Sequence, residues 1–298
     1  MTSTVTHRPA RDAATTAPNA SVTAAGQMPP STTAGGTRRR LGLLLGRVAL
    51  EVWLPVVLVG VWWFASANST SPFFPPLQKI LAKTWQVWVV QGRVSSDLLP
   101  SILNLLAGYG IAVIVGVAAG LALGLLPRLL DAVEPELEFL RAVPAVAILP
   151  IAIIAIGLGD DMRIAVIAFG ALWPILVNTV AGVRSTDPVV RDVSTAFRLK
   201  PAIALFSVRL PSAAPQILAG ARTALSIAVV LIVVSEMSGA YRGIGNFVLA
   251  AQRNYAITDM WTGMIVLGLL GYALNLVFRV VEARLLAWHP AYRKKGVK

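Results

Sequence analysis

Residues 98–127 read LLPSILNLLAGYGIAVIVGVAAGLALGLLP, a run of 30 residues without a charged side chain between Asp97 and Arg128. An α-helix rises about 1.5 Å per residue, so about 20 apolar residues cross the hydrocarbon core of a bilayer. The run is too long for a strand of a membrane barrel, which needs about 10 residues, and its apolar side chains do not alternate. It therefore predicts a transmembrane helix.

Five other apolar stretches of similar length occur in the chain. One of them, 217–237, contains Arg222 near its start and Glu236 near its end, but a long Arg side chain can reach the interface from a helix end. Glycines recur inside the stretches, which suits close packing of helices in lipid. We therefore expect an all-α integral membrane protein with six transmembrane helices, at 48–67, 101–126, 141–158, 163–183, 217–237 and 260–280.

The composition excludes most enzyme classes. Only 13% of the 298 residues are charged, whereas a soluble domain carries about 25%. The chain has no cysteine, and its two histidines, His7 and His289, lie near the ends. The phosphate-binding motif G-x-x-x-x-G-K-[ST] and the catalytic motifs G-x-S-x-G and H-E-x-x-H do not occur in the sequence. We therefore expect no catalytic residue, no metal site and no cofactor.

The basic residues predict the orientation of the helices, because short cytoplasmic loops carry an excess of Lys and Arg. If the six helices are threaded in order, 20 Lys and Arg residues fall on the side of the two termini and 6 on the other side. Both termini are therefore expected in the cytoplasm. The connection 127–140 lies on the same side and is acidic, but acidic residues contribute little to topology. Basic residues that flank spans do not indicate nucleic-acid binding.

The composition also divides the chain. Residues 1–37 contain nine Thr and eight Ala but no Leu, Ile or aromatic residue, which is typical of a disordered segment. We expect a disordered cytoplasmic tail at 1–42, a first transmembrane helix with an outer loop at 43–97, a core of five helices at 98–282 and a basic cytoplasmic tail at 283–298.

A cleaved signal peptide is the alternative for the first span. Arg38-Arg39-Arg40, an apolar run and Ala65-Ser66-Ala67 follow one another as in such peptides. However, the run contains Pro55 and Trp62-Trp63, and 37 residues precede the arginines. These features favour a span that is retained.

The connection 187–211 is long for a helical bundle, where links of two to eight residues are usual. Asp187-Pro188 is a favourable helix start, because Asp accepts amide hydrogen bonds and Pro fits the first turn. The segment has an amphipathic pattern, and Pro201 separates two short helical pieces. It is expected either to pack on its own bundle or to dock a separate subunit.

Residues 192–211 resemble the cytoplasmic loop of ABC importer permeases, E-A-A-x-x-x-G-x(9)-I-x-L-P. Without gaps, Asp192 falls at the Glu position, Val208 at the Ile position and Arg198 at the Gly position. The Gly ends the docking helix in the family, so another break is needed here, and Pro201 is expected to supply it. The resemblance implies that an ATPase subunit docks on Asp192, Val193, Ser194, Ala196, Phe197, Arg198, Leu199 and Pro211.

Other segments resemble the same family in order, over roughly residues 48–295. They include 141–157, 169–184, 217–222, 235–237 and 243–245, and the segment 288–292 resembles the branch that imports aliphatic sulfonates, taurine or nitrate. The resemblance implies a type I ABC importer permease fold in the bacterial cytoplasmic membrane. It also implies two copies of an ATPase subunit, an external substrate-binding protein, a second copy of the permease and contact with membrane lipid.

Polar residues inside the spans are candidates for the translocation path, because a polar group in hydrocarbon is costly unless it is paired or wet. These candidates are Asn178, Thr179, Ser235 and Glu236. Hydrogen bonding between helices is the alternative for the amide and the hydroxyls. For Glu236 the alternative is that its carboxylate lies at the outer end of a helix or pairs with Arg242.

The sequence therefore favours the permease subunit of an ATP-driven importer for a small anion. A self-sufficient secondary transporter or channel is the main alternative, although ion-coupled carriers often contain paired inverted repeats, which we do not find here. A membrane scaffold without transport is the third class. Co-purification of an ATPase would separate the first class from the other two.

Overall fold

The computed structural model describes residues 53–288, and every regular element in this range is helical. The tail 1–42 and the end of the basic tail, 289–298, lie outside the described residues. Residues 59–288 belong to one compact unit, to which the following description refers. The helices are α2 (Leu77–Thr84), η1 (Trp85–Val90), η2 (Val94–Leu98), α3 (Leu99–Leu125), α4 (Pro127–Ala142), η3 (Ala145–Ile148), α5 (Leu149–Ile156), α6 (Asp160–Arg184), α7 (Pro188–Ala196), α8 (Pro201–Ile203), η4 (Ala204–Arg209), α9 (Leu210–Met237), α10 (Ile244–Arg253) and α11 (Ile257–Leu285).

Four continuous helical segments are long and apolar enough to cross a membrane, namely 94–125, 160–184, 201–237 and 257–285. They coincide with four of the six predicted spans in position, length and apolar composition. The segment with α9 begins well before the predicted residue 217, because α8 and the π-helix η4 lead directly into α9, whose second residue is Pro211.

The region 127–158 differs from the prediction. The segment 127–140 was expected to be a loop and is the helix α4 instead. Val143 before Pro144 is extended, which is the conformation favoured before proline, and it ends α4. The pair formed by α4 and the following η3 and α5 is bent by 82°, so this region counts as a span only if the bent pair is taken together.

The first predicted span, 48–67, is described in part. Its helix runs over Trp53–Ser66 in the described residues and is apolar but shorter than the other four segments. Residues 48–52 lie outside the described range. The count of six spans therefore stays a prediction, with four segments observed and a fifth if the bent pair is included.

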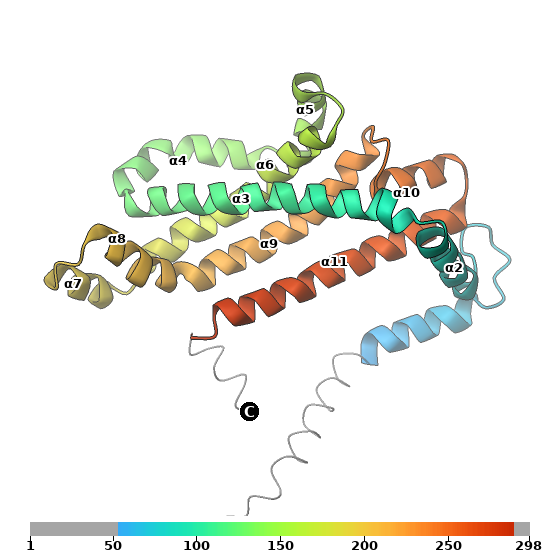
Figure 1. Cartoon of the computed structure of the whole chain (residues 1–298), viewed down its shortest axis with the longest axis horizontal. Helices are drawn as coiled ribbons and strands as arrows, with labels where there is room; N and C mark the ends of the chain where they lie inside the picture. Colours follow the sequence, from blue (N-terminus) through green and yellow to red (C-terminus); the bar gives the residue numbers. More distant parts are fainter. Residues whose placement is uncertain (1–52, 289–298) are drawn as a thin grey trace, which may run out of the picture. The chain divides into compact units, whose positions relative to one another are not determined.

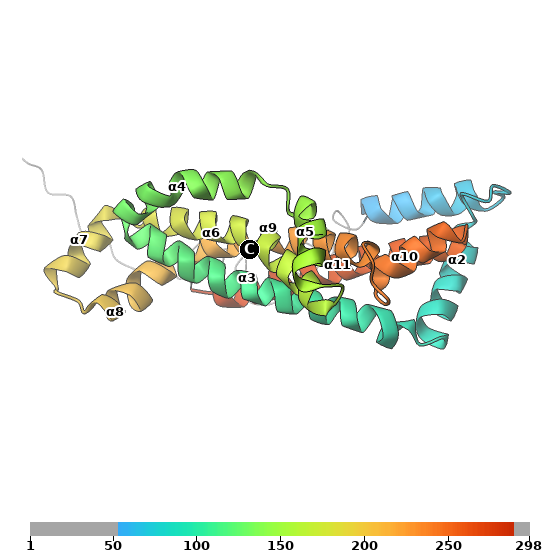
Figure 2. The same cartoon turned by 90° about the horizontal axis from the view of Figure 1, so that it is seen from above.

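The core lies between α3, α6 and α9, which run side by side (Figures 1 and 2). Its buried side chains include Leu105 on α3, Ile167 and Ile175 on α6, and Leu231 on α9. The glycines of α3 allow the close approach that the sequence predicted: a Cβ at Gly120 would lie 2.5 Å from the Cβ of Thr179 on α6. The polar Tyr109 hydroxyl donates a 2.9 Å hydrogen bond to the carbonyl of Ala221.

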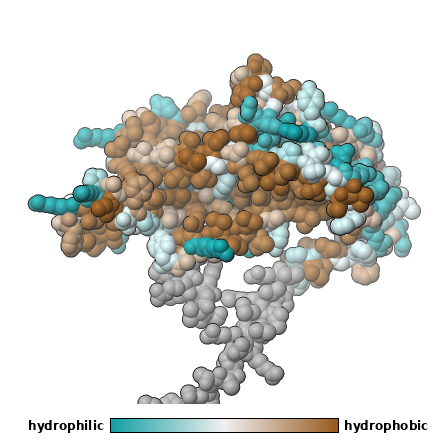
Figure 3. Space-filling view, in the orientation of Figure 1, coloured by the Kyte–Doolittle hydropathy of each residue, from teal (hydrophilic) through white to brown (hydrophobic). Residues whose placement is uncertain are grey.

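The two ends of the bundle carry different elements. Figures 1 and 2 both show α7 and α8 at one end of α3 and α9, and α2 and α10 at the opposite end. In Figure 3 apolar side chains cover most of the surface over α3 and α5, while hydrophilic side chains gather at the end where α10 lies. A broad apolar surface of this kind is what a membrane protein presents to lipid.

Candidate functional site

The segment between α6 and α9 forms the end of the bundle opposite α10. Its helix α7 begins as the sequence predicts: Pro188 is the first helical residue, and the Asp187 carboxylate accepts a 2.8 Å hydrogen bond from the backbone N–H of Val189. The carboxylate thereby satisfies one of the N–H groups that a helix leaves free in its first turn.

The end of α7 is set by Arg198, which adopts a left-handed backbone conformation with φ +49°. The Arg198 N–H donates to the carbonyl of Thr195 at 3.0 Å, and the Leu199 N–H donates to the carbonyl of Ser194 at 3.1 Å. This pair of bonds is the Schellman motif, whose left-handed position is usually glycine. Pro201 was expected to break the helix, but it lies beyond this motif and begins α8.

The structure brings most of the predicted docking residues together. Seven of them lie on α7 or directly after it, whereas Pro211 lies in the first turn of α9. Phe197 exposes 76% of its surface and Val193 exposes about half. Exposed apolar side chains on a short helix at the tip of a bundle are a surface that another subunit can cover.

A groove borders the C-terminal end of α7. It has a volume of about 700 Å³ and is lined by α7, by α8 with η4, and by Leu125 at the end of α3. Arg198 and Arg209 contribute its charged groups, and Leu205 and Phe206 contribute apolar surface. The groove therefore combines apolar contact area with positive charge.

Glu236, a predicted path residue, lies in a bonded cluster at the opposite end. Only 1% of its surface is exposed. Its carboxylate accepts a hydrogen bond from the Ser101 hydroxyl on α3 and a 2.8 Å hydrogen bond from the backbone N–H of Gly245 in the first turn of α10. Glu236 therefore joins the end of α9 to the start of α10 and to α3.

Neighbouring groups extend this cluster. The Asp97 carboxylate accepts a 3.1 Å hydrogen bond from the Gly243 N–H, and the Ser101 hydroxyl oxygen accepts one from the Ile244 N–H at 3.1 Å. Gly243 has φ +117°, and a Cβ there would collide with the Glu236 carboxyl group. The sequence pointed to Glu236 and to the segment 243–245 but not to Asp97 or Ser101 as their partners, because nothing local links residues that lie 135 to 146 positions apart.

Arg242 was considered as a partner of Glu236 and bonds elsewhere. It donates a 2.8 Å hydrogen bond to Asp160 at the start of α6. Asp160 also accepts hydrogen bonds from Asn104 and from the buried Arg163. The loop before α10 is thus tied to α6 and, through Asn104, to α3.

The other predicted path residues differ in exposure. Thr179 and Ser235 are buried, and each hydroxyl donates to a carbonyl of its own helix. Asn178 is partly buried, and its side-chain oxygen accepts a 2.9 Å hydrogen bond from Gln216 on α9. Asn178 also lines a surface cavity, together with Glu138, Arg141 and Trp173.

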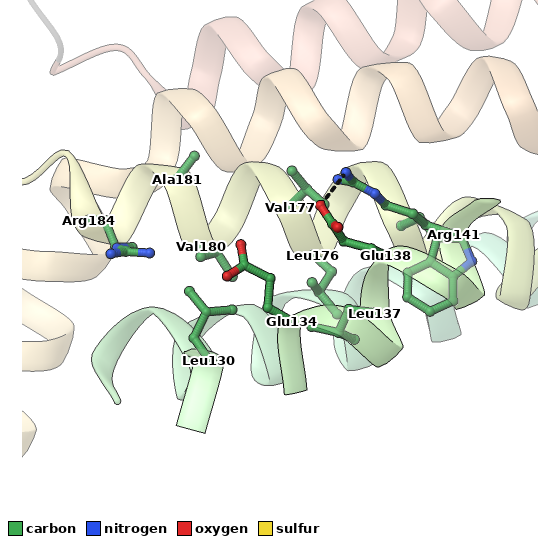
Figure 4. Close-up of a pocket in the computed structure, with 11 residues that line it drawn as sticks. Leu130, Glu134, Leu137, Glu138, Arg141, Leu176, Val177, Val180, Ala181 and Arg184 are labelled. Atoms are coloured by element: carbon green, nitrogen blue, oxygen red, sulfur yellow. Dashed lines mark hydrogen bonds and ion pairs between the residues drawn. The ribbon is translucent and has the colours of Figure 1, made fainter. Parts of the chain in front are cut away.

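A polar face that was not among the predicted site residues lies along α4. Glu134, Glu138 and Arg141 are spaced four and three residues apart, so they share one side of the helix. Glu138 and Arg141 form an ion pair of 3.2 Å and expose 61% and 48% of their side chains. Figure 4 shows all three reaching from α4 toward α6. The spacing is visible in the sequence, but it places the three side chains on one face only if 127–140 is a helix and not the expected loop.

The polar face of α4 borders a cavity of about 250 Å³ against the second half of α6. Arg141 lies beside Trp173 there, and Trp173 is 11 residues from the end of α6 at Arg184. Eleven residues of helix span about 16 Å, roughly half of the hydrocarbon thickness. If α6 crosses a membrane with Arg184 at the edge of the hydrocarbon core, exposed charges at this position cannot face lipid without a large cost.

Similarity to known proteins identifies the family. Residues 94–287 match the family described as "Binding-protein-dependent transport system inner membrane component". The taurine transport system permease protein TauC of Escherichia coli strain K12 is 31% identical over 249 residues, which cover 82% of this chain and 90% of TauC. The putative aliphatic sulfonates transport permease protein SsuC of Bacillus subtilis strain 168 is 28% identical, with 90% and 98% coverage.

Two further similarities are to a relative named for nitrate import and to a solved structure with a similar fold. The nitrate import permease protein NrtB of Synechocystis sp. strain PCC 6803 is 28% identical, over 76% of this chain and 85% of NrtB. A solved chain of the MetNI methionine ABC transporter, described in inward-facing conformations, has a TM-score of 0.52 and 21% identity. It covers 67% of this chain and 97% of its own length, and the likeness is one of fold.

The family match covers all four of the long apolar segments and the exposed segment between α6 and α9. Family members are inner-membrane components of transport systems that depend on a binding protein. The chain belongs to this family of binding-protein-dependent transport system inner membrane components, and it is a multi-pass transport subunit and not an enzyme.

Proposed function

We propose that this chain is the permease subunit of an ATP-driven importer of the bacterial cytoplasmic membrane and that its substrate is a small anion or sulfonate. The family match over 94–287 carries the first part of this proposal. The relatives named for taurine, aliphatic sulfonates and nitrate support the second part, because sulfonate and nitrate groups are both oxyanions.

The proposed topology has six transmembrane helices with both termini in the cytoplasm. The excess of 20 Lys and Arg residues on one side over 6 on the other supports it. In this orientation α7 and α8 lie at the cytoplasmic end and α10 lies at the outer end. The helix α4 with α5 acts as one bent span.

The proposed docking surface for the ATPase subunit is the segment 187–211. Its exposed Phe197 and Val193 and its position at one end of the bundle support this role. Closure of two ATPase subunits around ATP would push α7, and the push would reach α6 and α9, to which the segment is joined at its two ends.

The proposed translocation path follows the polar face of α4 and the facing half of α6. The path is lined by Glu134, Glu138, Arg141 and Asn178. A second copy of the chain faces this lining, and water fills the space between the two copies. The exposed ion pair near mid-membrane depth supports this proposal, because it needs either water or a protein partner. Thr179, Ser235 and Glu236 have their polar groups bonded inside the bundle, and we assign them a structural role.

Reconstituted transport tests the function. The purified chain is placed in proteoliposomes with its cognate ATPase subunit and binding protein, and uptake of taurine, an alkanesulfonate and nitrate is measured with and without internal ATP. We expect uptake of at least one of these anions that requires ATP and the ATPase. Uptake by the chain alone would contradict the proposal and favour a self-sufficient carrier.

A further inference from the structure

Arg198 occupies a position where a glycine would fit the backbone better. Its φ of +49° lies in the left-handed region, where the Cβ of any residue other than glycine crowds the following carbonyl. The two hydrogen bonds that end α7 are backbone bonds, so a glycine would make them equally well. The need to end the helix therefore does not explain the arginine side chain.

The side chain has no ionic partner in the part of the chain that the structure describes. None of the six ion pairs among residues 53–288 includes Arg198. From Phe197 to Arg209 the sequence contains Arg198, Lys200 and Arg209 but no acidic residue. The guanidinium group therefore borders a groove whose lining residues include two arginines, Arg198 and Arg209, and no carboxylate.

The groove around Arg198 indicates what could supply a counter-charge. Its walls carry Arg198 and Arg209 together with the apolar side chains of Leu205 and Phe206. An arginine binds a carboxylate through two parallel N–H bonds, which fixes the orientation of the partner as well as its charge. An acidic side chain beside an apolar one fits both parts of this groove.

We propose that Arg198 forms an ion pair with a carboxylate of the ATPase subunit, and that this contact is the reason an arginine is kept at a strained backbone position. The inference rests on the proposed docking function of the segment 187–211. It adds a residue that determines which ATPase the chain accepts, since an ATPase without the carboxylate would leave the groove's charge unmatched.

The test compares three variants of the full chain in detergent: Arg198→Gly, Arg198→Ala and Arg198→Lys. Binding of the purified cognate ATPase subunit is titrated at low and at moderate salt, and the thermal stability of each variant is measured beside it. Arg279→Ala, which removes an exposed arginine from α11, is the matched control. It should bind like the unmodified chain.

We expect Arg198→Gly to be at least as stable as the unmodified chain yet to bind the ATPase about tenfold more weakly, with less dependence on salt. Arg198→Ala should lose a similar factor, and Arg198→Lys should fall between, because Lys keeps the charge without the fork of N–H groups. Equal or tighter binding by Arg198→Gly would overturn the proposal, as would a loss of binding that follows a loss of stability. If even the unmodified chain does not bind the ATPase, the result contradicts the proposed function as an importer permease and not only the role of Arg198.

Discussion

At the scale of single residues, Glu236 and its partners explain how a carboxylate is kept at the end of an apolar helix. Both of its oxygens accept hydrogen bonds, one from Ser101 and one from the first turn of α10. Removing an acceptor from buried donors costs more free energy than the bond itself contributes. The carboxylate therefore holds three elements together at one end of the bundle.

Glu236→Ala and Glu236→Gln should separate a structural role from a role in the path. Alanine leaves the Gly245 N–H without an acceptor, so we expect a loss of about 1–3 kcal/mol in the free energy of unfolding. Glutamine keeps the shape and one oxygen, so we expect the variant to fold and to transport with unchanged KM and substrate preference. Thermal unfolding and proteoliposome uptake measure the two effects. A changed substrate preference in Glu236→Gln would indicate instead that Glu236 lines the translocation path.

Arg198 illustrates what a sequence motif can and cannot predict about a residue. The gapless spacing located the position where α7 ends, and the structure has the left-handed residue at that position. The motif could not predict how an arginine would satisfy it, because a backbone dihedral depends on the competition between strain and contacts with neighbours. Pro201 was the nearest known helix breaker in the sequence, and it begins α8 instead.

At the scale of elements, the contact between α3 and α6 depends on small side chains. A Cβ at Gly120 would meet the Thr179 side chain at 2.5 Å, and one at Gly116 would meet Ile175 at 2.9 Å. Gly110 on the same helix has nothing within 4 Å of an added Cβ. The glycines of α3 are therefore not equivalent, and only some of them set the distance between the helices.

Gly120→Ala and Gly110→Ala form a matched pair that tests this contact. We expect Gly120→Ala to destabilise the protein by about 1–3 kcal/mol, because the added methyl group forces α3 and α6 apart. Gly110→Ala should be neutral or slightly stabilising, since alanine favours a helix more than glycine does. Thermal stability in detergent measures both variants. Equal effects would mean that helix propensity, and not packing, determines the outcome.

The helix α4 shows where the sequence prediction of the fold reached its limit. Long apolar runs predicted α3, α6, α9 and α11, because hydrophobicity alone places such helices in a bilayer. Charged residues interrupt the apolar pattern over 127–140, so hydropathy predicts a connection there, whereas α4 is stable in a membrane only where water or a partner covers its charges. That environment depends on other molecules and cannot be inferred from hydropathy.

Cysteine labelling tests whether the polar face of α4 is wet. The chain contains no cysteine, so single cysteines can be introduced without a background signal. We expect Glu138→Cys to react quickly with a small water-soluble maleimide, because thiols ionise and react in water. Ile114→Cys, at a strongly exposed apolar position on α3, should react slowly since lipid covers it. Similar slow rates at both positions would contradict a water-filled path along α4.

At the scale of the whole molecule, the orientation in the membrane decides what each end of the bundle can do. The segment with α7 and the loop before α10 lie at opposite ends of the bundle (Figure 1). If the side with 20 Lys and Arg residues is cytoplasmic, α7 faces ATP, and the ion pair between Arg242 and Asp160 faces the binding protein. The reverse orientation would place the docking segment where no ATPase could reach it.

Two exposed aromatic positions can measure this orientation in intact cells. Tyr241 lies in the loop before α10 and Phe197 lies at the end of α7, and both side chains are largely exposed. In cells that express single-cysteine variants, we expect a membrane-impermeant maleimide to label Tyr241→Cys at once and Phe197→Cys only after permeabilisation. The opposite pattern would reverse the topology and, with it, the assignment of α7 to the ATPase. Labelling of Phe197→Cys should also decrease when the ATPase is co-expressed, because the docked subunit would cover that side chain.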